Sequence, residues 1–162
     1  MIKRIKSKIT AAYIAGIIDG EGTIGLYLGH RGEINSPHGR RTPTYSLRIR
    51  VRMCDKTIID WLLSSIGGRY YSKEGNDRHR DIHDWSIVGV DAIQFLKYIY
   101  PYLRVKKRQA DVALEFGKTL HALNSEGRIS DEIIIKRVAL REAMLSINFL
   151  HGKSRSGNCI KR

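Results

Sequence analysis

Cysteine and histidine are too few and too scattered in this 162-residue chain to build a covalent framework or a metal cluster. The two cysteines, Cys54 and Cys159, provide neither a disulfide network nor a thiolate zinc site, which favours a reducing, intracellular compartment. The six histidines show no metal-ligand spacing. No apolar run is long enough to span a bilayer. The apolar stretch near the N-terminus is interrupted by Asp19 and Glu21, which argues against a signal peptide but leaves an organellar address open.

Acidic residues are also scarce. The chain has 16 Asp and Glu against 29 Lys and Arg, a formal charge of +13 and an isoelectric point near 10.0. This excess predicts a polyanionic partner, and nucleic acid fits it best. A membrane-active basic protein fits less well, because the positive charge is spread over predicted strands and loops. The length suits a single domain, residues 1–162, with a substantial core.

The most informative stretch is a small-residue segment that we expect to be helical from about Thr10 to the glycine-containing stop at 20–22. Its bulky residues fall on one side. The other side carries small or short side chains at i, i+3, i+4 and i+7 spacing, which would let a second helix approach closely. These residues, which we predict at a dimer interface, are Ala12, Ala15, Gly16 and Asp19.

A strand with period-two alternation is the second clear pattern. The segment 45–53 has apolar residues at its odd positions, and the other side carries Arg48, Arg50 and Arg52. Alternate residues of a strand lie about 6.8 Å apart, close to two base-pair steps of duplex DNA. Arginine can read guanine through O6 and N7 in the major groove. An ordinary charged surface remains the alternative interpretation.

The remaining pattern predicts an α+β domain. A strand at 23–30 and a polar basic loop at 31–43 precede the arginine strand. A helix capped by Asp55, a second hairpin of 69–72 with 82–88, and a helix capped by Asp91 follow. C-terminal helices are expected over about 104–150, with Ser130 as an N-cap, before a basic tail at 151–162. The order favours one antiparallel four-stranded sheet with helices on one face.

Residues 14–22, Ile-Ala-Gly-Ile-Ile-Asp-Gly-Glu-Gly, resemble the LAGLIDADG motif of homing endonucleases. A buried amphipathic helix with a glycine cap is the alternative interpretation. The resemblance, which extends over about residues 10–120, implies an αββαββα core whose curved sheet straddles DNA in the major groove. In that family the motif helices form the seam between two such domains. A single motif therefore implies a homodimer that reads a nearly two-fold symmetric site.

The same resemblance implies site residues. Glu21, with the backbone carbonyl of Gly20, would bind Mg²⁺, for which Mn²⁺ could substitute, and Asp19 would accept hydrogen bonds from backbone N–H groups of the partner helix end. Asp55 aligns with a residue that positions water, although it could be only the helix cap. Lys106 aligns with a basic residue near the scissile phosphate, although it could only attract phosphate.

The predicted function is a homodimeric, Mg²⁺-dependent, site-specific DNA endonuclease encoded by a mobile intron, which leaves short 3′ overhangs. The alternatives are an RNA-binding intron maturase and a non-cleaving DNA-binding regulator on the same fold. The expected location is intracellular, either the cytoplasm of a prokaryotic or phage host or an organelle. The predicted DNA contacts are Tyr27, Arg31, Ser46, Arg48, Arg50, Arg52, Lys56, Arg78, Arg80 and Lys107.

Overall fold

The computed structural model describes residues 7–29, 44–76, 80–120 and 129–156, with side chains described as far as residue 150. The predictions for Arg31, Arg78 and the end of the basic tail lie outside the described residues. The first part of that tail continues the last helix as far as Ser156, so the predicted end of the helices at about residue 150 was placed too early. Among the described residues, no helix is long and apolar enough to cross a bilayer.

The motif segment forms helix α1, Lys8–Glu21, as predicted. Its buried side consists of Ala11, Ile14, Ala15 and Ile18. The helix passes directly into the first strand at Gly22, whose backbone is extended. A Cβ at Gly22 would lie 2.7 Å from the Cα and the carbonyl oxygen of Ile18, so only glycine fits this tight exit from the helix.

The predicted four-stranded antiparallel sheet is confirmed. Its strands are β1 (Gly22–Gly29), β2 (Thr44–Met53), β3 (Arg69–Lys73) and β4 (Ile82–Val88), in the order β1-β2-β4-β3. The odd residues of β2 point into the core: Leu47, Ile49 and Val51 are fully buried. The intervening arginines therefore project from the opposite, outer face of the sheet.

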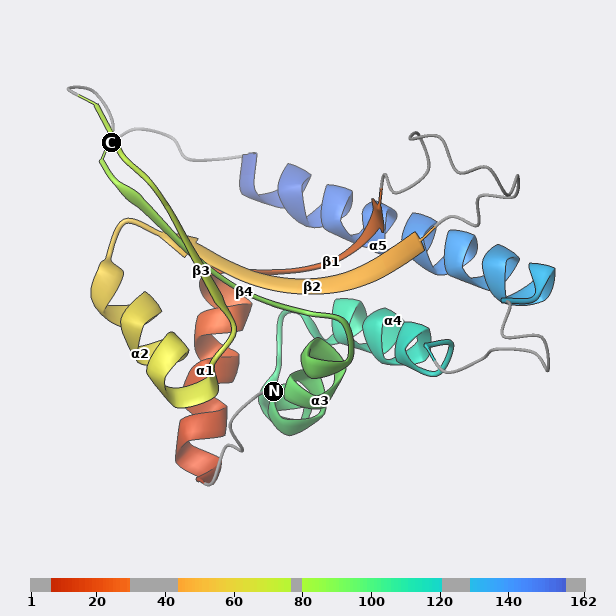
Figure 1. Cartoon of the computed structure of the whole chain (residues 1–162), viewed down its shortest axis with the longest axis horizontal. Coiled ribbons are helices and arrows are strands. Elements are labelled where there is room, and N and C mark those ends of the chain that lie inside the picture. The colour runs from red at the N-terminus through yellow and green to blue at the C-terminus, as the bar shows by residue number, and fades with distance from the viewer. Residues whose placement is uncertain (1–6, 30–43, 77–79, 121–128, 157–162) are drawn as a thin grey trace, which may run out of the picture.

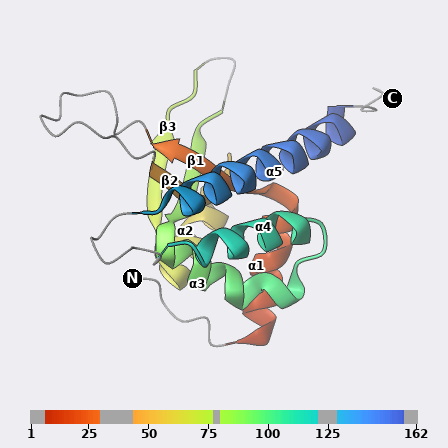
Figure 2. The same ribbon diagram turned by 90° about the vertical axis from the view of Figure 1, so that its right-hand side faces the viewer.

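The helices cover the inner face and one edge of the sheet. Helices α1, α2 (Lys56–Ile66), α3 (Gly89–Ile99) and α4 (Lys107–Gly117) lie below the curved strands in Figure 1. Helix α5 (Asp131–Ser156) packs against α4 and β1 (Figure 2). A short 3₁₀ turn, η1 (Tyr100–Tyr102), separates α3 from α4. Two sequence predictions were imprecise here, because α4 begins at Lys107, not Arg104, and Asp91 lies in the first turn of α3, which is capped by Val88.

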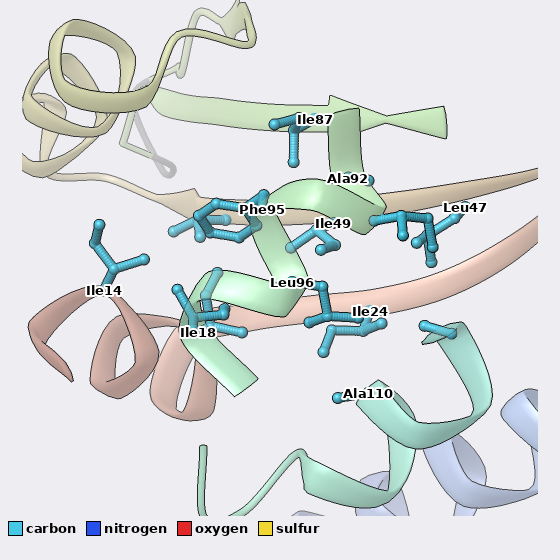
Figure 3. Close-up of a cluster of buried hydrophobic side chains, with 14 of the residues drawn as sticks. Ile14, Ile18, Ile24, Leu47, Ile49, Ile87, Ala92, Phe95, Leu96 and Ala110 are labelled. Atoms are coloured by element: carbon cyan, nitrogen blue, oxygen red, sulfur yellow. The ribbon is translucent and has the colours of Figure 1, made fainter. Parts of the chain in front are cut away.

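The core fixes α1 against the centre of the sheet. Figure 3 shows Ile14 and Ile18 of α1 beside Phe95 and Leu96 of α3, with Ile49 of β2 among the neighbouring side chains. All five are fully buried. Because both helices bury bulky side chains in the same cluster, the C-terminal end of α1 has a defined position relative to the sheet and to the segment after α3.

Candidate acidic site and nucleic-acid interface

The end of α1 is tied to the start of α4 by Asp19. Its Oδ2 accepts a hydrogen bond from the backbone N–H of Arg104 at 2.7 Å, and its Oδ1 accepts one from the N–H of Lys106 at 2.9 Å. We expected Asp19 to accept hydrogen bonds from a partner helix. Within the described chain, its two donors belong to its own segment 104–106, and the acceptance of further hydrogen bonds from a partner helix stays a prediction. The two N–H groups precede or begin α4, which leaves them available to a side-chain acceptor.

Lys106 completes this connection with its side chain. Its Nζ donates a hydrogen bond to the backbone carbonyl of Asp19 at 2.5 Å, and the residue is only 8% exposed. The contact brings a cation to the negative end of α1, two residues before Glu21 in the chain. The structure thus brings together Asp19 and Lys106, which the sequence separates by 87 positions.

Glu21 and Gly20 are exposed at the last turn of α1. A carboxylate and a backbone carbonyl are hard oxygen ligands of the kind that Mg²⁺ prefers, so their chemistry fits that ion. Within the described part of the chain, no group of three His, Cys, Asp or Glu residues could hold a metal. The binding of a metal ion by Glu21 and Gly20 stays a prediction.

Asp55 is the N-cap of α2. Its Oδ1 accepts a hydrogen bond from the backbone N–H of Thr57 at 2.8 Å. This satisfies one of the N–H groups that a helix start leaves without an intrahelical partner. The predicted cap is therefore confirmed, whereas the water-positioning role of Asp55 stays a prediction.

The exposed side of α1 is apolar and thinly covered. We define its open face as Ile9, Ala12, Tyr13, Gly16 and Gly20, all of which are exposed. A Cβ added at Gly16 or Gly20 would meet no atom of the described residues within 4 Å. The predicted interface changes in one member, because Ala15 is fully buried within its own chain and cannot contact a partner.

The outer face of the sheet carries an acid that our sequence reasoning missed. Asp84 of β4 is only 4% exposed, and its Oδ2 accepts hydrogen bonds from Arg50 Nε at 2.5 Å and from Arg52 Nε at 3.2 Å. The hydrogen bond to Asp84 raises the pKa of the Arg50 guanidinium above its ordinary value. Two of the three predicted arginines of β2 therefore share one buried counter-ion.

The other predicted DNA contacts lie outside the cluster of Asp84, Arg50 and Arg52. Arg48 stacks over Tyr27 of β1, with its guanidinium carbon 5.1 Å from the ring centroid, and half-buried Ser46 pairs with Tyr27 in the β1–β2 register. Lys56 forms an exposed ion pair with Asp60 at 2.6 Å.

Arg80 is exposed near the tip of the second hairpin. Lys107 Nζ lies 5.1 Å from the centroid of the Tyr100 ring. These residues do not gather into one cluster, so the structure supports their DNA contacts only as separate predictions.

Strand β3 adds outer-face residues that we did not select from the sequence. Arg69 pairs with Ser86, and Tyr71 with Asp84, so both stand on the same side of the sheet as Asp84. Lys73 follows two positions later, and all three are exposed. The period-two pattern Arg-Tyr-Tyr-Ser-Lys contained this signal, but a strand this short alternates too briefly to stand out.

Comparison with known proteins finds matches in structure and none in sequence. No family model matches the sequence, and no curated protein matches it. The fold resembles that of the homing endonuclease I-CvuI in complex with the I-CreI target and Mg (TM-score 0.67, 19% identity, 86% of this chain and 82% of that one). It also resembles the archaeal intron-encoded homing endonuclease I-Vdi141I complexed with DNA (0.66, 17%, 86% and 84%).

A third similar structure is longer. The LAGLIDADG homing endonuclease I-LtrWI bound to target DNA gives a TM-score of 0.60 at 16% identity, and the match covers 86% of this chain but 45% of that one. The present chain thus corresponds to about half of that protein. Sequence identities of this size establish the architecture, and all three comparisons agree on it. The chain has the fold of the LAGLIDADG homing endonucleases.

Proposed function

We propose that this protein is a homodimeric, Mg²⁺-dependent, site-specific DNA endonuclease. The observation that carries the proposal lies at the end of α1. There Asp19 and Lys106 are joined by two hydrogen bonds, and Glu21, two residues after Asp19, is exposed. An exposed acid two residues after the carbonyl that anchors the Lys106 ammonium suits phosphodiester hydrolysis. An exposed carboxylate repels phosphates unless a cation lies between them, so it favours a metal-dependent nuclease over a protein that only binds nucleic acid.

The open face of α1 supports the dimer. It combines exposed apolar side chains, Ile9 and Tyr13, with glycines that leave space for a second backbone. Burying such a face against its symmetric copy would remove apolar surface from water. It would also place the Glu21 residues of the two protomers on either side of one seam. The match to about half of I-LtrWI supports the same arrangement.

The outer face of the sheet supports DNA as the substrate. Arg48, Arg50, Arg52 and Arg69 project from it, and the solved structures that share the fold include DNA complexes. A two-fold dimer would present this face twice, so the target should be nearly palindromic. We propose that each protomer's site cuts one strand, which would leave short 3′ overhangs.

Each residue of the acidic site has a separate task in this proposal. Glu21 and the Gly20 carbonyl would hold the divalent ion, which when bound supplies Lewis-acid stabilisation of the phosphate charge. Lys106 would hold its ammonium near the scissile phosphate and stabilise the additional negative charge of the transition state. Asp19 fixes the segment that carries Lys106. Asp55 stays a predicted orienter of water.

The test uses purified protein and a duplex that spans the joined flanks of the insertion site of its reading frame. Cleavage of both strands is expected in Mg²⁺ and not in Ca²⁺. Glu21→Gln should reduce cleavage by at least ~10³-fold while leaving binding in Ca²⁺ intact. Glu142→Gln, at an exposed position of α5, is the matched control and should cleave normally.

Two results would contradict the proposal. Cleavage by Glu21→Gln at the wild-type rate would remove Glu21 from the site. Tight binding of the wild type with no cleavage in Mg²⁺ or Mn²⁺ would favour a non-cleaving regulator. Preferential binding of the intron RNA, measured in parallel with the same protein, would favour the maturase alternative.

A further inference from the structure

The contacts of the buried acid on the outer face of the sheet bear on how the protein would recognise a DNA sequence. Asp84 stands directly opposite Arg52 in the β2–β4 register, with Arg50 two residues away on β2. Both arginines donate from Nε to the same oxygen, Oδ2, and Arg50 adds a second contact through Nη2. Asp84 is 4% exposed, whereas the side chains of Arg50 and Arg52 are 30% and 53% exposed. The acid is thus enclosed and the arginines reach the surface.

Asp84 occupies one edge of each guanidinium, and the other edge remains for a ligand. Arginine carries five N–H donors in a planar fork, and the contacts described use the Nε side. The Nη1 and Nη2 end of the fork is the part that forms two parallel hydrogen bonds to O6 and N7 of guanine. Asp84 holds Arg52 through Nε and holds Arg50 through the Nε and Nη2 edge, so Nη1 and the second hydrogen of Nη2 remain for a base on each guanidinium.

Fixing the arginines also changes how they compete for phosphate. A free arginine loses side-chain entropy when it binds any anion, whereas a side chain already held loses less on meeting a correctly placed base. One carboxylate between two guanidiniums leaves a local net charge of +1 instead of +2, so attraction to phosphates of any sequence is weaker. Both effects favour specific over non-specific binding.

We infer that Asp84 is a positioning residue that makes Arg50 and Arg52 readers of G·C base pairs in the major groove. The inference rests on the proposed DNA binding and adds a mechanism of sequence selectivity to it. Arg48 is a built-in contrast on the same strand face. Within the described chain, Arg48 stacks on Tyr27 and forms no ion pair, so its contribution to binding should not depend on Asp84.

The experiment selects bound duplexes from a randomised DNA pool in Ca²⁺ and sequences them, so no target needs to be known. Wild type, Asp84→Asn and Arg48→Gln are compared, and thermal unfolding checks that each variant is folded. The preference of Asp84→Asn for G·C over other base pairs should be about 10-fold lower than that of the wild type at one or two positions in each half-site. Arg48→Gln should change preference only at other positions.

Salt dependence provides a readout that loss of structure would not imitate. Without the Asp84 charge, binding to non-specific duplex should tighten, and the slope of log affinity against log salt should steepen by about 0.9. Asp84→Glu keeps the charge and moves the acceptor, so it should shift base preference without steepening the slope. This second variant decides the matter if Asp84→Asn is unfolded.

The inference is overturned if folded Asp84→Asn retains the wild-type base preferences and salt slope. It is also overturned if Asp84→Asn and Arg48→Gln lose preference at the same positions. A wild type that binds duplex with no base preference overturns the inference and leaves DNA binding intact. A wild type that binds no duplex overturns the proposed DNA function together with the inference.

Discussion

The end of α1 and the outer face of the sheet use their acidic residues in opposite ways. At the end of α1, Asp19 holds its own chain together and the next acid, Glu21, stays exposed. On the sheet, the acid Asp84 is buried and the cations around it are exposed. The first arrangement presents negative charge to a cation, and the second presents positive charge to an anion.

The difference separates cutting from reading. The α1 region is small, sits beside the open face that a partner would cover, and holds Lys106 within hydrogen-bonding distance of the helix end. The sheet face is broad and carries its cations on β2 and β3. Changes at the helix should therefore affect dimerisation and the rate of cleavage. Changes on the sheet should affect affinity and sequence preference.

The largest expected effect comes from Gly16→Arg on the open face of α1. No described atom of the chain would lie within 4 Å of a Cβ at Gly16, so the monomer should fold normally. A charged side chain in a symmetric helix seam would keep the protomers apart, and double-strand cleavage should fall by more than ~10²-fold because burying an unpaired charge costs several kcal/mol. Light scattering and a cleavage assay measure both effects.

Ala139→Arg is the control for this change, because Ala139 is exposed on α5, away from the open face. It should remain dimeric and active. If Gly16→Arg stays dimeric at the wild-type rate, α1 is not the seam. If the wild type is a monomer that cleaves, the dimer itself is wrong.

The next largest effect concerns the rate of DNA cleavage, which the end of α1 should control separately from DNA binding. Lys106→Met keeps much of the buried chain but removes the ammonium that contacts the Asp19 carbonyl. Single-turnover cleavage with saturating protein should fall by about 10²-fold to 10³-fold, the range found when one charge-stabilising donor is removed. Binding in Ca²⁺ should change little. Lys97→Met, on an exposed site of α3, should match the wild type, and a larger loss of binding than of rate would contradict a catalytic role for Lys106.

The two regions also differed in how far the sequence predicted them. Helix α1, β2 and the Asp55 cap were predicted because their signals are local: small-residue spacing, strict alternation and one side chain two residues from its donor. The Asp84 cluster and the contacts of Asp19 were not predicted. Each joins residues more than 30 positions apart, and only the register of β2 with β4 or the packing of η1 on α1 brings them together.

A smaller effect concerns Arg69, the outer-face cation that the sequence analysis missed. Arg69→Gln should weaken DNA binding several-fold and make the salt slope shallower by about 1 if the side chain contacts a phosphate. Cleavage at saturating protein should stay at the wild-type rate, because Arg69 lies on β3, far along the sheet order from β1 and the end of α1. Lys97→Gln serves as the matched control. Loss of cleavage rate without loss of affinity would break the proposed division between reading and cutting.

The smallest expected effect concerns an ion pair that helps to hold α5 against α4 and β1. Glu115 of α4 contacts Lys118, the C-cap of α4, and Lys136 of α5, each at 2.6 Å, and these hydrogen bonds lower the pKa of Glu115 from 4.5 to about 2. Because the folded pKa is below the unfolded one, this stabilisation is complete above about pH 4.5 and disappears as the pH falls towards 2.

Thermal unfolding at low salt should therefore show wild type slightly more stable than Glu115→Gln at pH 6, with a difference that shrinks below about pH 4.5. The shift should be small because the Glu115 side chain is 35% exposed, and solvent and salt screen its ion pairs. Glu142→Gln, which lies on the exposed side of α5, should show no such pH dependence. A difference between wild type and Glu115→Gln that stays constant from pH 6 to pH 2.5 would mean that the carboxylate does not help to hold α5 beside the sheet.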